Sequence, residues 1–315
     1  MFSNAVVFSL SANVDVTDEV CAKLGIEKGK CEVKKFADGE LIVDILECIR
    51  GKNIYVIQST CSPVNERLME LLVFVDALKR ASAKEITCII PYYGYGRQDR
   101  QAKAREPITA RLVADLLQVA GVHRVVSFDL HAPQIQGFFT CPVDNLSAGN
   151  LIGSYFKKRL AGEDVVVVSP DHGGVTRARN LAVYLNASIA VFDKRRPKPN
   201  VAEIVDVIGD VKGKVAVVID DMIDTGGTIL GTVNFLKKEG ATKIYVACTH
   251  PVLSNGALEK ICATDIEELV VTNTIPLKGE CDKVIVLSMA TMIAQTIKVI
   301  EHGGSLTTVY DFYRD

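Results

Sequence analysis

The sequence contains no tryptophan, and only 6% of its 315 residues are aromatic. It also lacks any apolar run that approaches the ~18 residues of a membrane-spanning helix, and no cationic segment with a long apolar core opens the chain. The formal net charge is −2 and neither half carries a large basic excess, which argues against a general nucleic-acid-binding protein. We therefore expect no membrane and no nucleic-acid partner.

Cysteines are present, but not in the patterns that bind zinc or form a disulfide framework. The nine cysteines are an odd number, and no two of them stand in a C-x-x-C pair. Scattered cysteines of this kind are typical of reduced, mostly buried thiols in a cytoplasm. We therefore expect a cytoplasmic protein with reduced cysteines.

The rest of the composition is typical of a globular α/β protein. Hydrophobic residues make up 48% of the chain, and short apolar runs alternate with amphipathic stretches. This alternation predicts parallel sheets with crossover helices, and the length allows two domains with separate cores. Strands are predicted at residues 5–10, 53–58, 86–90, 125–128, 165–169, 189–192, 215–219, 244–249 and 284–287. Helices are predicted at residues 64–81, 107–120, 148–160, 174–185, 227–239 and 289–302, with Pro107 in the first turn of its helix.

The two halves of the sequence have a similar organisation. Each has a βα succession with a polar loop after a strand, at residues 91–105 and 220–228. Ligands of doubly wound sheets bind beyond the carboxyl ends of the strands, so these loops are the expected sites. We place the boundary near residues 142–149, which gives domains of residues 1–146 and 147–315. Residues 40–47 are less regular and predict an antiparallel hairpin with the strand near Lys34.

Residues 215–228, VAVVIDDMIDTGGT, are the most informative segment. An apolar strand ends in Asp220 and Asp221, and Asp224 precedes a Thr-Gly-Gly-Thr turn that opens a helix. The turn offers hydroxyls, backbone N–H groups and a helix N-terminus, which together suit a phosphate. The carboxylates suit vicinal hydroxyls or a hydrated metal ion. The segment predicts a sugar-phosphate site, since an ordinary capped turn needs no adjacent pair of carboxylates.

Residues 193–200, DKRRPKPN, place four cations within five positions after a predicted strand. Two prolines and the charge density disfavour a helix or a central strand, so a loop is predicted. A solvated basic loop is the usual meaning of such a run. Phosphoryl transfer, however, needs cations that neutralise the charge on the transferring oxygens, which favours a catalytic loop here.

The 215–228 segment resembles the phosphoribosyl-diphosphate binding signature of the phosphoribosyltransferase-like fold. Residues 91–100, PYYGYGRQDR, and 127–139, SFDLHAPQIQGFF, narrow the resemblance to the class I ribose-phosphate diphosphokinases (phosphoribosyl diphosphate synthetases). The resemblance runs from residue 36 to at least residue 273. It implies two tandem phosphoribosyltransferase-like domains, each a mostly parallel sheet flanked by helices. The implied reaction transfers the diphosphoryl group of MgATP to the C1 hydroxyl of ribose 5-phosphate, for nucleotide biosynthesis.

The resemblance also implies roles for individual residues. Lys194 and Arg196 would be catalytic residues of a flexible loop, and a magnesium ion would lie at His131 and Asp171. His172 matches no position of the family pattern and is interpreted as structural. Ribose 5-phosphate would be bound by Arg196, Asp220, Asp221, Asp224, Thr225, Gly226, Gly227 and Thr228, and ATP by Phe36, Asp38, Gly39, Glu40, Arg97 and Gln98.

A homo-hexamer is implied as well, in which Phe36, Asp38 and Glu40 reach the ATP of a neighbouring subunit. Arg50, Arg105 and Ser305 would be candidate phosphate contacts of a regulatory ADP. Two segments depart from the family pattern, residues 9–15 after the first strand and residues 305–314 at the C-terminus. Both lie outside the substrate loops.

Two other functions share part of this pattern. A phosphoribosyltransferase would have the 220–228 loop, but one domain would serve it and the 91–100 segment would be unexplained. A non-catalytic regulator related to the synthetases could lose the catalytic cations, whereas Lys194, Arg196, His131 and Asp171 are all present.

Overall fold

The computed structural model describes residues 4–198 and 201–313, and it describes residues 193–198 and 201–206 through their backbone alone. The chain divides into two compact units. Unit 1 consists of Met1–Ser147, Thr274–Pro276 and Ser288–Val309, and unit 2 of Ala148–Asn273, Leu277–Leu287 and Tyr310–Asp315. The division at residue 146 stays a prediction about domains. The compact units themselves are not continuous in sequence, because the C-terminal helix belongs to unit 1.

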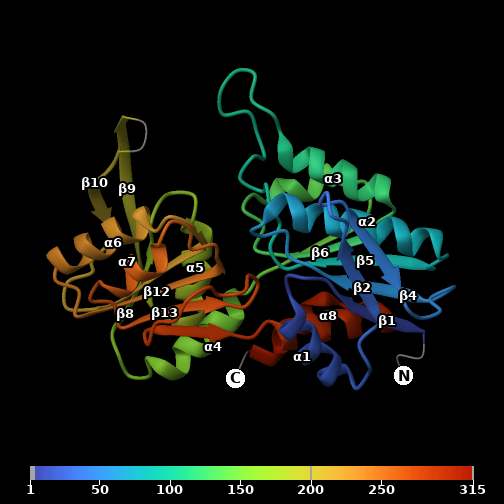
Figure 1. Cartoon of the computed structure of the whole chain (residues 1–315). Helices are drawn as coiled ribbons and strands as arrows, with labels where there is room; N and C mark the ends of the chain where they lie inside the picture. Colours follow the sequence, from blue (N-terminus) through green and yellow to red (C-terminus); the bar gives the residue numbers. More distant parts are fainter. Residues whose placement is uncertain (1–3, 199–200, 314–315) are drawn as a thin grey trace. The chain divides into compact units, whose positions relative to one another are not determined.

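Unit 1 is built on a five-stranded, wholly parallel sheet of order β1-β4-β5-β6-β7. Four of its strands, β1, β4, β5 and β6, are mostly apolar and buried, as strands covered on both faces must be, whereas the edge strand β7 is more polar and only partly buried. The prediction of parallel sheets is therefore confirmed for this half (Figure 1). The strands are β1 (Ala5–Ser9), β4 (Asn53–Ile57), β5 (Glu85–Ile90), β6 (Arg124–Phe128) and β7 (Val143–Leu146).

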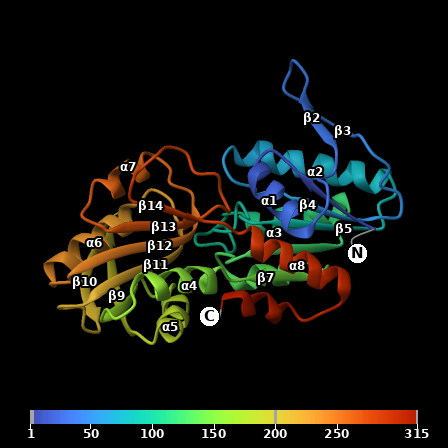
Figure 2. The same cartoon turned by 90° about the horizontal axis from the view of Figure 1, so that it is seen from below.

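Helices cover both faces of this sheet. α2 (Val64–Arg80) and α3 (Thr109–Ala120) bury Phe74 and Leu117 against strand residues such as Val56 and Ile90. The opposite face carries α1 (Val14–Leu24) and α8 (Ala290–His302), which pack against each other (Figure 2). An antiparallel hairpin of β2 (Cys31–Lys35) and β3 (Leu41–Ile45) lies on α2, which confirms the predicted hairpin.

Unit 2 contains a seven-stranded sheet of order β10-β9-β8-β11-β12-β13-β14. All neighbours are parallel except the edge pair β9 and β10. The strands are β8 (Val165–Ser169), β9 (Ser188–Lys198), β10 (Val201–Ile208), β11 (Val215–Ile223), β12 (Lys243–Pro251), β13 (Glu268–Thr272) and β14 (Val284–Leu287).

Helices also cover both faces of the second sheet. One face packs on α6 (Gly227–Lys238) and α7 (Ala257–Cys262) through residues such as Val233 and Ile261. The other packs on α4 (Gly149–Arg159) and α5 (Val175–Leu185), which bury Phe156 and Leu181. None of the helices in the described part of the chain is long and apolar enough to cross a bilayer.

The structure corrects two local predictions. Residues 194–198 are not a loop: they continue β9, and β10 pairs with them in an antiparallel edge hairpin. An edge position tolerates Pro197, because a proline there removes no hydrogen bond of a central ladder. Pro107 is not in the first turn of a helix, since α3 begins at Thr109. The predictions also omitted β7, β10, β13, α1 and α7.

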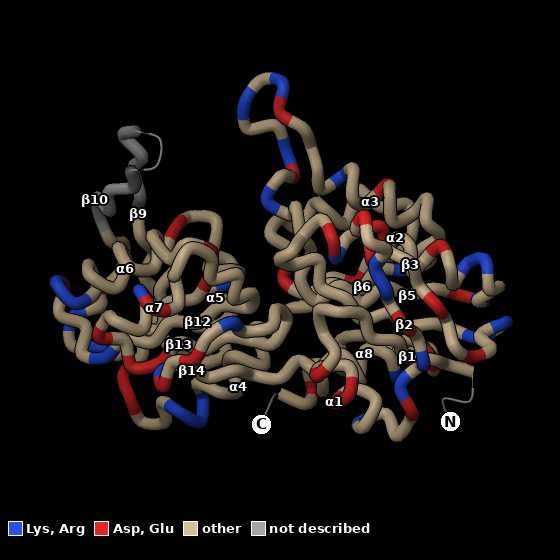
Figure 3. The backbone as a smooth tube through the Cα atoms, in the orientation of Figure 1, with Lys and Arg blue, Asp and Glu red and all other residues tan. Residues whose placement is uncertain are grey.

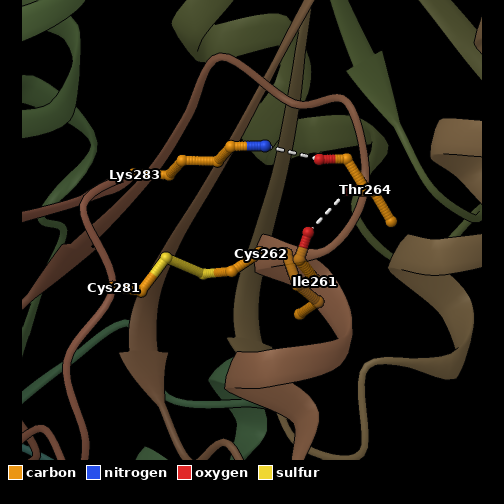
Figure 4. Close-up of a disulfide and its surroundings, with 5 residues drawn as sticks. All are labelled: Ile261, Cys262, Thr264, Cys281 and Lys283. Atoms are coloured by element: carbon orange, nitrogen blue, oxygen red, sulfur yellow. Dashed lines mark hydrogen bonds between the residues drawn. A yellow bond between two sulfur atoms is a disulfide. The ribbon is translucent and has the colours of Figure 1, made fainter.

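The expectation of nine reduced cysteines is wrong for two of them. Cys262, the last residue of α7, forms a disulfide with Cys281 in the segment that leads into β14 (Figure 4). Lys283 supports the same contact by donating a hydrogen bond of 2.6 Å to the carbonyl of Thr264. A pairing of this kind depends on where α7 and β14 lie in the fold. The spacing of the cysteines in the sequence does not reveal it.

We predict that Cys281→Ser lowers the stability of unit 2. The disulfide joins residues with a sequence separation of 19. In the chain-entropy model, a cross-link that closes a loop of this size destabilises the unfolded state by about 3 kcal/mol. Denaturant unfolding with and without a dithiol reductant measures the effect. The reductant should shift the wild-type transition and leave the variant unchanged, and Cys48→Ser, which removes an exposed free thiol, should behave as wild type. A wild-type transition that the reductant does not move contradicts the prediction.

Candidate active site

The predicted sugar-phosphate segment lies at the carboxyl end of β11 and the start of α6. β11 runs to Ile223, four residues beyond the predicted end, because Asp220, Met222 and Ile223 pair with β12. Asp220 and Asp221 therefore belong to the strand and not to the loop. The following residues, Thr225, Gly227 and Thr228, are exposed.

Gly226 shapes the turn between the strand and the helix. It adopts the left-handed conformation (φ 78°), which a side chain disfavours. A Cβ at this position would also lie 3.2 Å from Cδ1 of Ile261 in α7. No side chain of the described residues caps α6, and its first turn contains no acidic residue. The N-terminus of α6 therefore presents its backbone N–H groups and positive dipole end to an anion.

Asp220 and Asp221 form an ion-paired group with Arg177 of α5. Nη1 of Arg177 lies 3.4 Å from Oδ1 of Asp220 and 3.7 Å from Oδ1 of Asp221. The Asp221 backbone N–H also donates to Oδ1 of Asp220 at 2.9 Å. The carboxylates are 18% and 8% exposed, so the group is largely shielded from water.

The electrostatics of this group are dominated by burial. Burial raises the pKa of Asp220 to about 8, and the neighbouring Asp221 carboxylate adds to the rise. The Arg177 guanidinium opposes it by favouring the charged form. Arg177 thus offsets part of the repulsion between two buried like charges.

Two further carboxylates border the loop. Asp224 accepts a hydrogen bond from the hydroxyl of Ser254, which follows β12. Asp171 follows β8, and its Oδ1 accepts from the backbone N–H of Gly174 at 3.1 Å. His172 beside it is exposed.

The side chain of Asp171 provides the kind of ligand that Mg²⁺ usually binds in proteins. Its carboxylate is a hard oxygen donor, and the hydrogen bond from Gly174 orients it. Within residues 4–198 and 201–313, no group of three or more His, Cys, Asp or Glu side chains is arranged to hold a metal ion. Mg²⁺ does not need such a cage, because it keeps several waters and binds through one or two carboxylates plus substrate phosphates.

The catalytic cations of the prediction lie on the β9–β10 hairpin. Lys194 pairs through its backbone with Ile204 of β10. The side chains of Lys194 and Arg196 lie outside the described residues, so their roles stay predictions.

In unit 1 the structure brings together two of the predicted ATP and metal segments. A Cβ at Gly96 would lie 3.8 Å from Cβ of His131, so the turn before Arg97 lies beside the segment after β6. Gln134 in that segment also donates to Asp99 at 2.6 Å. The loop from β5 to α3 extends away from the rest of unit 1 and carries several cations (Figure 3).

Gln98 and Gly94 are fixed by local contacts. The Gln98 side-chain oxygen accepts a hydrogen bond of 2.5 Å from the hydroxyl of Thr109, at the start of α3. A Cβ at Gly94 would lie 2.3 Å from the carbonyl oxygen of Thr60, so only glycine fits there. Arg97, Gln98 and His131 are all exposed.

The third predicted ATP element is the turn between β2 and β3. Asp38 accepts from the backbone N–H of Glu40 at 3.1 Å, and Gly39 supplies the positive φ of the turn. The Phe36 side chain is 53% exposed. Gly39 and Glu40 line, together with Met69 of α2, a pocket of about 590 Å³.

Two of the residues expected to contact a regulatory ADP form local hydrogen bonds. Arg50 donates to the hydroxyl of Ser82 at 2.9 Å, and Ser305 shares a hydrogen bond of 2.7 Å with Thr307.

Arg177 and Ser254 received no predicted role. Both reach the site from other elements, and the only sequence signal for Arg177 was its place three residues after a Gly-Gly turn.

Two family models match this chain. The N-terminal domain of ribose phosphate pyrophosphokinase matches residues 5–121, and the phosphoribosyl synthetase-associated domain matches residues 190–311. The crystal structure of phosphoribosylpyrophosphate synthetase from Mycobacterium smegmatis is similar to the whole fold, with a TM-score of 0.90 and 43% identity. The match covers 96% of this chain and all of that chain.

Curated relatives also match this chain over nearly its full length. Ribose-phosphate pyrophosphokinase of Bacillus caldolyticus is 54% identical over 97% of this chain and 97% of its own. Ribose-phosphate pyrophosphokinase 1 of Listeria monocytogenes is 52% identical over 97% of this chain and 96% of its own. Because the similarity covers nearly the full length of both partners, the chain belongs to the ribose-phosphate pyrophosphokinase family.

Proposed function

We propose that the protein is a ribose-phosphate diphosphokinase. It transfers the diphosphoryl group of MgATP to the C1 hydroxyl of ribose 5-phosphate, which gives 5-phosphoribosyl 1-diphosphate, AMP and a proton. The observation that carries the proposal is the uncapped N-terminus of α6 directly after the carboxylate pair of β11. A phosphate and two sugar hydroxyls are the ligands that this pairing suits.

The sugar half of the site follows from that arrangement. The 5-phosphate would accept hydrogen bonds from the first N–H groups of α6 and from the hydroxyls of Thr225 and Thr228. Asp220 and Asp221 would accept from the ribose 2- and 3-hydroxyls. Asp224, held by Ser254, would close the loop.

Transfer itself would rely on position and charge. The C1 oxygen attacks the β-phosphorus of ATP while the bond to the α-phosphate oxygen breaks, so AMP leaves in line with the attack. Lys194 and Arg196 would neutralise the charge on the transferring oxygens. No general base is required if the proton passes to solvent.

ATP and Mg²⁺ complete the site. Phe36, Asp38, Gly39 and Glu40, with Arg97 and Gln98, would bind the nucleotide, and His131 and Asp171 would be the protein contacts of Mg²⁺. When bound, the metal ion neutralises phosphate charge. Asp171 supplies an oxygen oriented by Gly174, and the His131 side chain is exposed. The protein would act in the cytoplasm.

The phosphoribosyltransferase alternative receives less support. The match to the N-terminal domain of the pyrophosphokinases covers residues 5–121, a half that the base-transfer reaction does not need. The same half contains the packed contact between the segments of Gly96 and His131. A non-catalytic regulator could lose the catalytic cations, whereas Lys194, Arg196, His131 and Asp171 are all present.

We also propose that the protein assembles as a homo-oligomer, with a hexamer as the family pattern implies. On α3, Val113 and Leu117 face the core, but Leu112, Leu116 and Val119 on the opposite face are 55%, 39% and 78% exposed. Their spacing of four and three residues forms one apolar stripe. A second copy of the chain would remove this stripe from water, and the exposed Phe36 of the β2–β3 turn could then contact a neighbour's ATP.

A product assay tests the reaction. With ribose 5-phosphate, ATP and Mg²⁺, the protein should form AMP, and ADP would identify a different transfer. Lys194→Ala should lower turnover at least ~100-fold while the fold is unchanged, because a group that stabilises transition-state charge is lost. Lys238→Ala, an exposed lysine of α6, is the matched control. Near-normal turnover of Lys194→Ala would remove Lys194 from the mechanism.

A mixing experiment tests the shared ATP site. Lys194→Ala and Glu40→Ala should each be inactive, and an equal mixture should recover activity. Random exchange leaves about one quarter of the composite sites with both residues intact. Subunit exchange is followed with a fluorescent label, and sedimentation gives the size of the active species. Complete exchange without recovery, or an active monomer, defeats the shared-site model.

The raised pKa of Asp220 predicts a pH-dependent stability. The folded protein binds this proton up to about pH 8, whereas the unfolded chain releases it near pH 3.8. Stability is therefore greatest below the unfolded value and falls as the pH rises through this window. For each pH unit in this window, the unfolding free energy of the wild type should fall by about 1 kcal/mol relative to that of Asp220→Asn. Urea unfolding between pH 4 and pH 8 measures this, and parallel curves would contradict it.

A further inference from the structure

The reaction proposed above gives Arg177 no role, although Arg177 lies inside the sugar-phosphate site. It is the third residue of α5, and its side chain is 20% exposed. Its guanidinium lies within 3.7 Å of both carboxylates that follow the strand core of β11. The N-cap Gly174 leaves room for it: a Cβ there would lie 2.9 Å from the Ser169 hydroxyl and 3.8 Å from Nη1 of Arg177.

The position of Arg177 is unfavourable for a cation unless a partner compensates. The N-terminus of a helix carries the positive end of the macrodipole, and acidic residues are preferred there. The first turn of α5 contains none. The compensation comes from another element, because Asp220 and Asp221 approach from β11, the parallel neighbour of β8.

The carboxylates need this partner as well. Two shielded like charges repel each other, and repulsion is relieved either by rotation of one side chain or by uptake of a proton. Both responses remove acceptors that a pair of vicinal hydroxyls requires, since a protonated carboxyl gives up part of its acceptor capacity. A fixed guanidinium restricts the rotation, because its planar fork can hold two carboxyl groups in one geometry, and it opposes the larger effect of burial on the pKa of Asp220.

We propose that Arg177 is a positioning residue for ribose recognition: it holds the Asp220 and Asp221 carboxyl groups in one arrangement, in which both accept hydrogen bonds from ribose hydroxyls. The inference rests on the proposed function and adds a residue through which the sugar half of the site is assembled. Arg177 acts through the carboxylates, so its loss affects the sugar and not the nucleotide.

Steady-state kinetics of Arg177→Gln separate these two substrates. The KM for ribose 5-phosphate should rise at least ~10-fold, while the KM for ATP stays within about twofold of wild type. Arg177→Lys should give an intermediate KM, because lysine keeps the charge without the planar fork. Arg179→Gln, an exposed arginine two residues further along α5, should match wild type.

A double-mutant cycle tests whether Arg177 works through the carboxylates. Binding of ribose 5-phosphate is measured by calorimetry in the wild type and in Asp220→Asn/Asp221→Asn, each with and without Arg177→Gln. In the wild-type background Arg177→Gln should weaken binding. In the doubly substituted background it should add less than about twofold, because its partners are already neutral. Should Arg177→Gln not fold, Arg177→Lys is used in both backgrounds with the same expectation at a smaller amplitude.

Four results would overturn the proposal. Equal losses in both backgrounds would mean that Arg177 contacts the substrate itself, and a raised KM for ATP alone would place it in the nucleotide half. An unchanged KM for ribose 5-phosphate in a wild type that forms AMP would end the Arg177 proposal and leave the proposed function standing. If the wild type neither binds ribose 5-phosphate nor forms AMP, the proposed function fails, and this inference fails with it.

Discussion

Two carboxylates placed side by side at the end of a covered strand require a cation, and the surroundings of the sugar-phosphate loop meet this requirement. β11 continues past the sheet core through its pairing with β12, which carries Asp220 and Asp221 into a shielded position. Because β8 and β11 are parallel neighbours, the helix that follows β8 begins where β11 ends. Arg177 on that helix therefore meets the carboxylates without any special loop. The parallel topology supplies the charge balance.

The sequence could predict those parts of the site that are continuous in the chain. The run from Asp220 to Thr228 indicates a strand, a turn and a helix start by its residue types alone, and the structure places these elements there. Arg177 and Ser254 could not be found in this way, because each comes from a different βα unit and meets the loop only in three dimensions. The residues that hold the ligand loop in place are therefore less visible in the sequence than the loop itself.

The errors in the fold have physical causes of the same kind. The prediction of a loop at residues 194–198 weighed charge and proline against a central strand, but an edge hairpin accommodates both, since one side of an edge strand needs no partner. The helix α1 was omitted although Val16, Val20 and Leu24 repeat at helical spacing. The disulfide of Cys262 with Cys281 could not be predicted either, because pairing depends on the packing of α7.

That packing links the disulfide to the ligand loop. Gly226 turns the chain from β11 into α6 with a positive φ, and the side chain of Ile261 lies close to where a Cβ of residue 226 would project. Ser254, just before α7, holds Asp224 from the same side. Cys262 follows Ile261 directly and fixes the end of α7 to the segment before β14. The loop that would bind the phosphate is thus supported from behind by α7. Its shape depends on two neighbours: Arg177, which pairs with the carboxylates of Asp220 and Asp221, and Ile261, which packs against Gly226.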